Sequence, residues 1–272
     1  MSEDKEMTME ILVTKGNVEE KTLKLEADQE LHITIESGAR LQLLLECNGG
    51  NVVTDIVVGQ GASLDLCDLD MSEAGVTRTH DLHILMDNDS QAFIHTVSLA
   101  NGNARNSTKV ELNGEGAELS LNGLVIASQA QRVENHTLVH HTVPHCTSNQ
   151  LYKYVLDDHA VGTYAGLVKV FEGAHHTHSE QTNRNLCLTR EAHMYTQPQL
   201  EIYNDDVRCS HGATVGQLDE NALFYMQQRG ISKHEAQLLL MSAFAGEVVD
   251  LIRIPELRER LHSLVERRFR NL

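Results

Sequence analysis

The sequence predicts a mainly β protein: a stacked β-solenoid over residues 1–216, followed by a small helical subdomain over residues 217–272. Three observations predict it. Apolar residues fall at every second position through the first part of the chain. A motif of turn, alanine and alternating leucines recurs loosely, with its alanines at Ala39, Ala62, Ala92 and Ala117. After Gly216 the apolar spacing becomes helical.

The alternating segments predict the strands of the first part. They are "LHITIE" (31–36), "ARLQLLLE" (39–46), "ASLDLCDLD" (62–70), "DLHILMD" (81–87), "AFIHTVSLA" (92–100), "AELSLNGLVIA" (117–127) and "LVKVFEG" (167–173). A repeat of 20–30 residues is typical of a solenoid, in which each rung buries its inner face against its neighbours. The leucines expected to face inward are Leu41, Leu43, Leu64, Leu66, Leu119 and Leu121. Because the repeat is inexact, a β-sandwich or barrel is the alternative.

The last part of the chain carries helix signals in sequence order. Asp219 is an expected N-cap, and Gly230 ends the helix that it starts. "SKHE" is a capping box, with Ser232 at the N-cap and Glu235 three residues on. A break is expected at Gly246, and Pro255 opens a further helix. The apolar stripe of that helix is Leu257, Leu261, Leu264, Val265 and Phe269.

Composition excludes several classes of protein. The chain has 272 residues and a formal net charge of −17, which disfavours nucleic acid as a partner. The five cysteines are far apart and form no CxxC motif, which fits a reducing cytoplasm rather than a disulfide framework. No signal peptide or membrane span is expected. The acidic excess lies in residues 1–216, so the helical part is either ordinary solvated surface or a surface for a different partner.

Histidines are the most unusual feature for chemistry, with 16 in the chain. One cluster is His140, His141, His145 and Cys146, and the other is His175, His176, His178 and Glu180. Neither matches a closed zinc motif, so surface or partner-facing histidines are the expectation for both. No HExxH, phosphate-binding glycine loop or GxSxG motif occurs.

Cys209 and His211 lie where the chain changes character, in the turn-rich stretch "DDVRCSHGATVGQ" (205–217). In an extended strand they share one face, and Gly212 and Gly216 would permit tight turning. Two ligands are too few for a zinc site formed within one chain. The pair is therefore a metal site shared with a partner, a structural turn between the two parts, or a catalytic pair.

A long stretch, residues 198–249, resembles the C-terminal part of the SufB/SufD family, the scaffold proteins of SUF iron–sulfur cluster assembly. It reads "PQLEIYNDDVRCSHGATVGQLDENALFYMQQRGISKHEAQLLLMSAFAGEVV". The segments 140–170 and 182–203 are also similar to that family. The SufB branch has Glu-His-Glu where this chain has Ser210, His211 and Gly212. The form "CSHGATVG" is similar to the SufD branch.

The resemblance implies a right-handed parallel β-helix and a non-catalytic scaffold. It implies pairing with a SufB-like protein, or self-pairing in isolation, and binding of a SufC-like ATPase by the C-terminal helices. Residues expected at that ATPase surface are Phe224, Arg229, Leu239 and Phe244. Cys209 and His211 are implied to lie near the partner interface, where iron or a cluster binds transiently, with no cofactor held tightly by the isolated chain. Members also carry an N-terminal helical region, whereas this sequence begins with strand-like segments.

Two rival functions remain from the residues alone. One is a β-helical enzyme acting on polysaccharide, for which the absence of tryptophan leaves few sugar-stacking platforms. The other is a stand-alone histidine-rich metal-binding homodimer. Metal content of the purified chain, with and without partners, distinguishes them.

Overall fold

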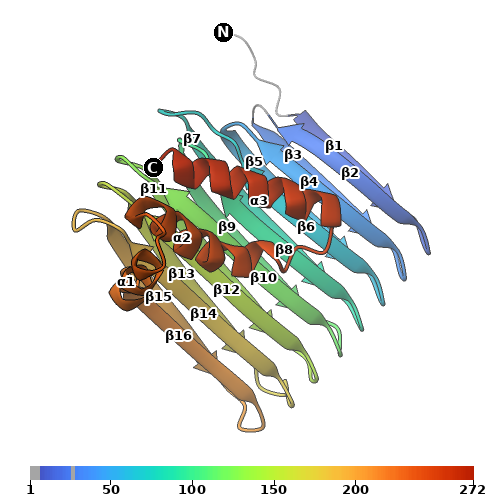
Figure 1. The fold of residues 1–272 in the computed structure, drawn as a ribbon. Coiled ribbons are helices and arrows are strands. Elements are labelled where there is room, and N and C mark those ends of the chain that lie inside the picture. Colours follow the sequence, from blue (N-terminus) through green and yellow to red (C-terminus); the bar gives the residue numbers. More distant parts are fainter. Residues whose placement is uncertain (1–6, 26–27) are drawn as a thin grey trace.

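Two parallel β-sheets face one another in the computed structural model, which describes residues 7–25 and 28–272 (Figure 1). Sheet A has the strand order β1 (Met7–Val13), β3 (Gln29–Ile35), β5 (Gly50–Val58), β7 (Thr77–Met86), β9 (Asn103–Leu112), β11 (Arg132–His141), β13 (Val161–Val170) and β15 (His193–Ile202). Sheet B has the order β2 (Val18–Leu25), β4 (Arg40–Cys47), β6 (Ser63–Asp70), β8 (Gln91–Ser98), β10 (Glu118–Ala127), β12 (Thr147–Leu156), β14 (His178–Cys187) and β16 (Arg208–Gly216).

The chain alternates between the sheets, so each strand pairs with the strand two places away. Leu41 of β4 lies beside Leu64 of β6, and like positions stack along the molecule. All six leucines predicted to face inward are at most 2 % exposed and belong to one apolar cluster between the sheets. The parallel β-solenoid is confirmed, and the antiparallel sandwich or barrel is excluded because the described strand pairs are parallel.

Three helices follow the strands: α1 (Glu220–Gln228), α2 (Lys233–Val249) and α3 (Pro255–Arg270). The Asp219 N-cap, the Ser232–Glu235 capping box and Pro255 at the start of α3 are confirmed. The break predicted at Gly246 is wrong. Gly246 is buried inside α2 and continues the helix, and a Cβ atom at this position would meet His262 of α3 only at an ordinary van der Waals distance of 3.9 Å.

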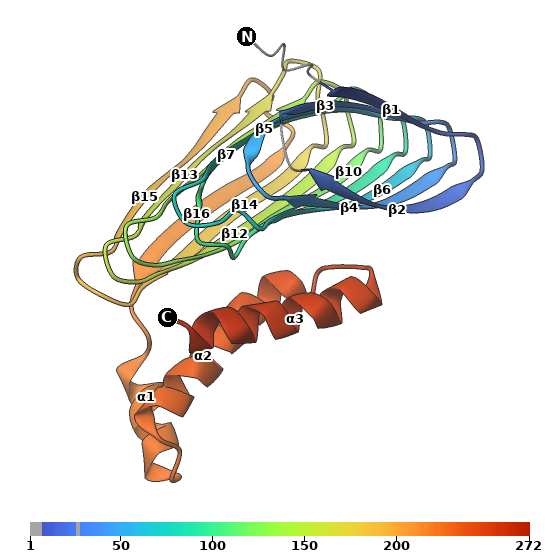
Figure 2. The same cartoon turned by 90° about the horizontal axis from the view of Figure 1, so that it is seen from above.

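Helices α2 and α3 cover the outer face of sheet B, as Figure 2 shows, and leave the outer face of sheet A open. An apolar cluster unites the two layers through Leu69, Leu124 and Val155 of the sheet with Val248 and Leu261 of the helices. The α3 stripe is therefore used within the chain. No helix of the described residues is long and apolar enough to cross a membrane.

Polar contacts hold the helices on the same face. Lys153 of β12 has a fully buried side chain, its Nζ lies 2.6 Å from Glu247 of α2, and it donates to the Phe244 carbonyl oxygen at 3.0 Å. Arg260 of α3 pairs with Glu46 of β4, and Arg268 donates to Gln131 at 2.7 Å. These two arginines therefore neutralise or cap groups on the solenoid within the chain.

Candidate functional site

Cys209 and His211 lie on β16, the terminal strand of sheet B. Of the alternatives left open for this stretch, the structural turn is wrong and the extended geometry expected for Cys209 and His211 is confirmed: residues 208–216 form a regular strand that pairs with β14, and Gly212 and Gly216 do not adopt positive φ. Cys209 pairs in register with Ser179, and His211 with Gln181. Ser179 and Gln181 are buried inward-facing residues, so Cys209 and His211 face the interior side at the open end of the solenoid.

The two side chains differ in access. Cys209 is half-buried and packs against the edge of the interior cluster, whereas His211 is exposed. Burial raises the pKa of the Cys209 thiol, and the backbone N–H of Ser179 offsets this only in part. The thiol therefore keeps its proton in the isolated chain, and an incoming metal ion must displace it. Within the described ranges, no third ligand-type side chain converges on the pair.

The interior beside this end is polar. The Gln181 side chain is fully buried, and neither its Nε2 nor its Oε1 atom has a hydrogen-bond partner among the described residues. Gln150 of the preceding strand accepts from Thr137 at 3.0 Å, while its Nε2 atom lacks a partner in the same part of the chain. The end that presents Cys209 and His211 is thus the end where polar side chains replace the leucines of earlier rungs.

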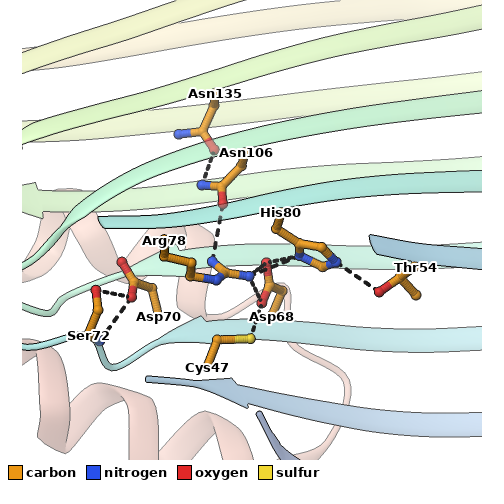
Figure 3. A network of polar contacts seen from close by, with 9 residues as sticks. All are labelled: Cys47, Thr54, Asp68, Asp70, Ser72, Arg78, His80, Asn106 and Asn135. Atoms are coloured by element: carbon orange, nitrogen blue, oxygen red, sulfur yellow. Dashed lines mark hydrogen bonds and ion pairs between the residues drawn. The ribbon is translucent and has the colours of Figure 1, made fainter. Parts of the chain in front are cut away.

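A second polar group, shown in Figure 3, lies deep between the sheets and was missed from the sequence. Arg78 of β7 donates to both carboxylate oxygens of Asp68 at 2.5 and 2.7 Å, and His80 lies 2.8 Å from the same carboxylate. Arg78 also donates to Asn106 at 3.1 Å. The signal was present in "ASLDLCDLD", because Asp68 occupies the same alternate positions as the inward residues Leu64 and Leu66.

The charges of Asp68, Arg78 and His80 stabilise one another in the interior of the solenoid. Burial acts to raise the pKa of Asp68, but the Arg78 guanidinium and His80 outweigh it and hold that pKa well below its usual range. The neighbouring Cys47 thiol lies 3.6 Å from Asp68, and its pKa is raised far above its ordinary value, first by burial and then by the carboxylate. Cys47 is therefore an inert thiol rather than a nucleophile.

The two histidine clusters separate in the structure. His140 lies on the outer face of sheet A against Phe171, whereas His141 is buried and bonded to Ser148 at 2.8 Å. Burial lowers the pKa of His141 to about 3, so its ring is neutral. The histidines brought together are His145 and His176, whose rings stack with centroids 4.8 Å apart.

Those two rings sit in turns at one edge of the solenoid, and both residues have positive φ (63° and 57°). His176 also contacts Asp206, with Nδ1 and Oδ2 3.2 Å apart. From the other cluster positions, His175 contacts Asn204 and His178 is exposed at the start of β14. Neither cluster forms one metal centre among the residues that the structure describes.

Of the residues expected at the ATPase surface, Phe224 and Leu239 are 62 % and 53 % exposed, and Arg229 at the end of α1 is also exposed. Phe244 is half-buried under Lys153, with Nζ 4.3 Å from its ring centroid. Helix α1 has no buried residue. A cleft of about 780 Å³ lies between α1, α2, the end of α3 and the ends of β12 and β14, lined in part by Phe224, Leu238 and Met241.

Comparison with known proteins gives the family. The model for "SUF system FeS cluster assembly, SufBD core domain" matches residues 19–244. The chain belongs to the SufBD family. The match spans the solenoid from β2 onward together with α1 and most of α2.

Relatives in the SufBD family support the SufD branch. The chain is 36% identical over 185 residues to the iron–sulfur cluster assembly protein SufD of Escherichia coli, covering 68% of this chain and 44% of that protein. It is 31% identical over 215 residues to a SufBD family protein of Synechocystis, covering 79% and 48%. A Mycobacterium leprae SufBD family protein is 35% identical over 192 residues, covering 68% and 49%. The chain thus spans about half the length of these relatives.

Proposed function

We propose that this chain acts as a SufD-type scaffold subunit in iron–sulfur cluster assembly in the cytoplasm. It pairs with a SufB-like protein and binds a SufC-like ATPase, and it performs no catalysis itself. Iron or a nascent cluster is the cargo, held transiently where the two scaffold chains meet.

The observation that carries this proposal is the open last rung of the solenoid. Strands β15 and β16 end their sheets, and among residues 7–25 and 28–272 no further strand pairs with their outer edges. Tyr195 (63 % exposed), Tyr203 (59 %) and Val215 (51 %) lie in or beside these strands. Unpaired edges accept another strand, and solenoid ends require a cover. A second protein with the same fold offers a matching end.

Cys209 and His211 support a shared site at this end. They supply one thiol and one imidazole on the interior-facing side of β16, and a partner chain supplies the further ligands. Both donor types suit iron and iron–sulfur clusters. Because the raised pKa of Cys209 keeps the thiol protonated, binding releases a proton and strengthens as pH rises.

The proposed ATPase surface is α1 with the adjoining exposed part of α2. Exposed Phe224, Arg229 and Leu239 combine apolar area with a guanidinium, as anchors of protein interfaces do. Phe244 is left out of this surface because it packs on the solenoid.

Reconstitution with the SufB-like partner and the SufC-like ATPase tests the shared site. We expect Cys209→Ser and His211→Ala to leave the complex assembled and to lower its iron or cluster content severalfold. Ser210→Ala is the matched control, because Ser210 lies between the two on the opposite face of β16. Unchanged cluster content in both variants contradicts the shared site, and full metal content in the chain without partners favours a stand-alone metal-binding homodimer.

Binding of the ATPase is tested separately. We expect Phe224→Ala and Leu239→Ala each to weaken ATPase binding at least about tenfold, the effect of removing a well-packed interface side chain. Pairing with the SufB-like protein should be unchanged in these variants. Calorimetric titration of the ATPase into each purified chain measures the effect, and wild-type affinity in both variants rules out this surface.

A further inference from the structure

The open outer face of sheet A carries a line of alternating carboxylates and imidazoles. In register across three neighbouring strands lie His32 of β3, Asp55 of β5 and His83 of β7. Glu30 flanks the line on β3 and Glu111 flanks it on β9. The helices cover only sheet B, so this face stays accessible (Figure 2).

Each imidazole lies between two carboxylates. His32 Nε2 is 3.3 Å from Glu30 Oε1, and His32 Nδ1 is 3.4 Å from Asp55 Oδ2. The other oxygen of Asp55 is 3.6 Å from His83 Nδ1, and His83 Nε2 is 3.1 Å from Glu111. Every ring nitrogen of His32 and His83 therefore faces a carboxylate oxygen at 3.1–3.6 Å, so imidazole and carboxylate donors alternate along the line.

Permanent positive charge is unevenly distributed along this line. Glu111 has Lys109 Nζ 2.6 Å away. In the part of the chain that the structure describes, Glu30 and Asp55 pair with histidine and with no lysine or arginine. Their side chains and that of His32 are 41–44 % exposed, which lets an ion reach them while the strands fix their spacing.

We propose that Glu30, His32 and Asp55 bind one divalent first-row transition-metal ion. One ligand atom from each lies within 4.8 Å of the others. Two ligands about 2.1 Å from a tetrahedral ion are about 3.4 Å apart, which is the separation of His32 Nδ1 from Asp55 Oδ2. The flexible Glu30 side chain closes the remaining gap, and water completes the shell.

His83 is a positioning residue for this site. It contacts the Asp55 oxygen that faces away from His32 and is itself held by Glu111. Outer partners of this kind orient the ligands of protein metal sites. A set of one imidazole and two carboxylates suits Zn²⁺, Fe²⁺ or Mn²⁺, whereas Ca²⁺ and Mg²⁺ prefer oxygen alone. The site is independent of the proposed pairing at β16, which lies on the other sheet.

Titration of the chelator-treated full chain with Zn²⁺ by calorimetry, and with Fe²⁺ without oxygen, tests the proposal. We expect His32→Gln and Asp55→Asn to lose one binding equivalent or at least about tenfold in affinity. His136→Gln is the matched control, because its ring faces Glu134 at 3.4 Å on the same outer face without a second carboxylate contact among the described residues. Cys209→Ser combined with His211→Ala should retain the equivalent.

Anomalous diffraction at the zinc edge locates the ion, and so distinguishes binding at this site from binding at other histidines of the chain. The expected peak lies between His32 and Asp55. Wild-type binding by His32→Gln, an equal loss in His136→Gln, a peak only elsewhere, or equal competition by Ca²⁺ each overturns the proposal. Circular dichroism of every variant checks that the loss of binding is not a loss of folding.

Discussion

At the scale of single residues, the interior of the solenoid combines apolar packing with a buried group of charged side chains around Asp68 and Arg78. Asp68 and Arg78 leave water together, and their mutual contact, with the further contacts to His80 and Asn106, offsets the cost of removing both charges from solvent. Such a pair adds little net stability when intact. It is costly when broken, because the remaining partner stays buried and charged.

Asp68→Asn isolates that cost. The amide keeps the shape of the side chain but leaves the Arg78 guanidinium without its counter-charge, so we expect the free energy of unfolding to fall by about 3–5 kcal/mol. Urea denaturation at pH 7 measures it. Asp81→Asn, at an exposed position of β7, should change the same quantity by no more than about 0.5 kcal/mol. Equal midpoints for the two variants would show that the buried pair is not formed.

The lowered pKa of His141 should make the free energy of unfolding depend on pH. Its folded-state pKa of about 3 lies below the value of about 6.5 expected in the unfolded chain. Between these values the unfolded state binds a proton that the folded state does not, so stability falls as pH decreases, by about 1.4 kcal/mol per pH unit. The contribution is fully present only above pH 6.5.

His141→Gln removes this term while keeping a side chain that reaches Ser148. Urea midpoints at pH 6.5 and 5 should therefore show the wild type losing about 2 kcal/mol more than the variant. The buried His95, whose pKa is lowered to about 4, contributes equally to both chains and cancels in the difference. An identical loss in the two proteins would place the His141 ring in a hydrated setting.

At the scale of elements, α3 covers apolar side chains on the outer face of sheet B. Leu261 is fully buried against the outer face of the sheet, and Ser263 is exposed on the same helix. We expect Leu261→Asp to release α3, to increase binding of an apolar dye, and to leave most strand signal in circular dichroism. Ser263→Asp should bind no more dye than the wild type. Loss of all strand signal in Leu261→Asp would mean that the sheets need the helix to fold.

The strands predicted from the sequence have apolar inward positions, as in "ARLQLLLE" with Leu41 and Leu43. β5 was missed even though its inward residues include Val52 and Ile56. Strands β9, β12 and β14 escaped the pattern because their inward residues include Asn106, Gln150 and Gln181, which match no hydrophobic alternation. A turn was kept as one alternative for β16 because glycine and polar residues fill this exposed terminal strand. The helix caps were predictable because they depend on local residues alone.

The candidate sites also differ in how far the sequence predicts them. Alternation alone places Cys209 and His211 on one face. The Glu30, His32 and Asp55 group joins residues more than 20 positions apart, so only the register of β3 with β5 reveals it. The contacts of the α3 arginines with the solenoid also depend on tertiary structure, so the distribution of charge along the sequence could not predict them.

At the scale of the whole molecule, charge opposes self-association. Each chain carries −17, so two chains meeting at the open end repel one another at low ionic strength. We expect homodimerisation of the isolated chain to tighten severalfold between about 10 mM and 150 mM NaCl, as screening shortens the range of that repulsion. Sedimentation equilibrium measures the dissociation constant.

Val215→Lys and Leu12→Lys locate the contact. These residues are 51 % and 56 % exposed and lie on the last and the first sheet strands, β16 and β1. Only Val215→Lys should keep the chain monomeric at both salt concentrations. Monomer formation by Leu12→Lys, or weaker association in salt, would move the interface away from β16.

The covering of sheet B by α2 and α3 also sets an order of events during protein synthesis. Glu46 and Asn101 lie on rungs that leave the ribosome early, whereas their partners Arg260 and Arg268 are made only after the last strand, β16. At roughly 5–20 residues per second, several seconds separate the last strand from the end of α3. During that interval the rungs can already stack, while the apolar strip of sheet B faces solvent. The nascent chain therefore exposes the most apolar surface, and is most prone to aggregation, in the interval before α3 emerges and packs on sheet B.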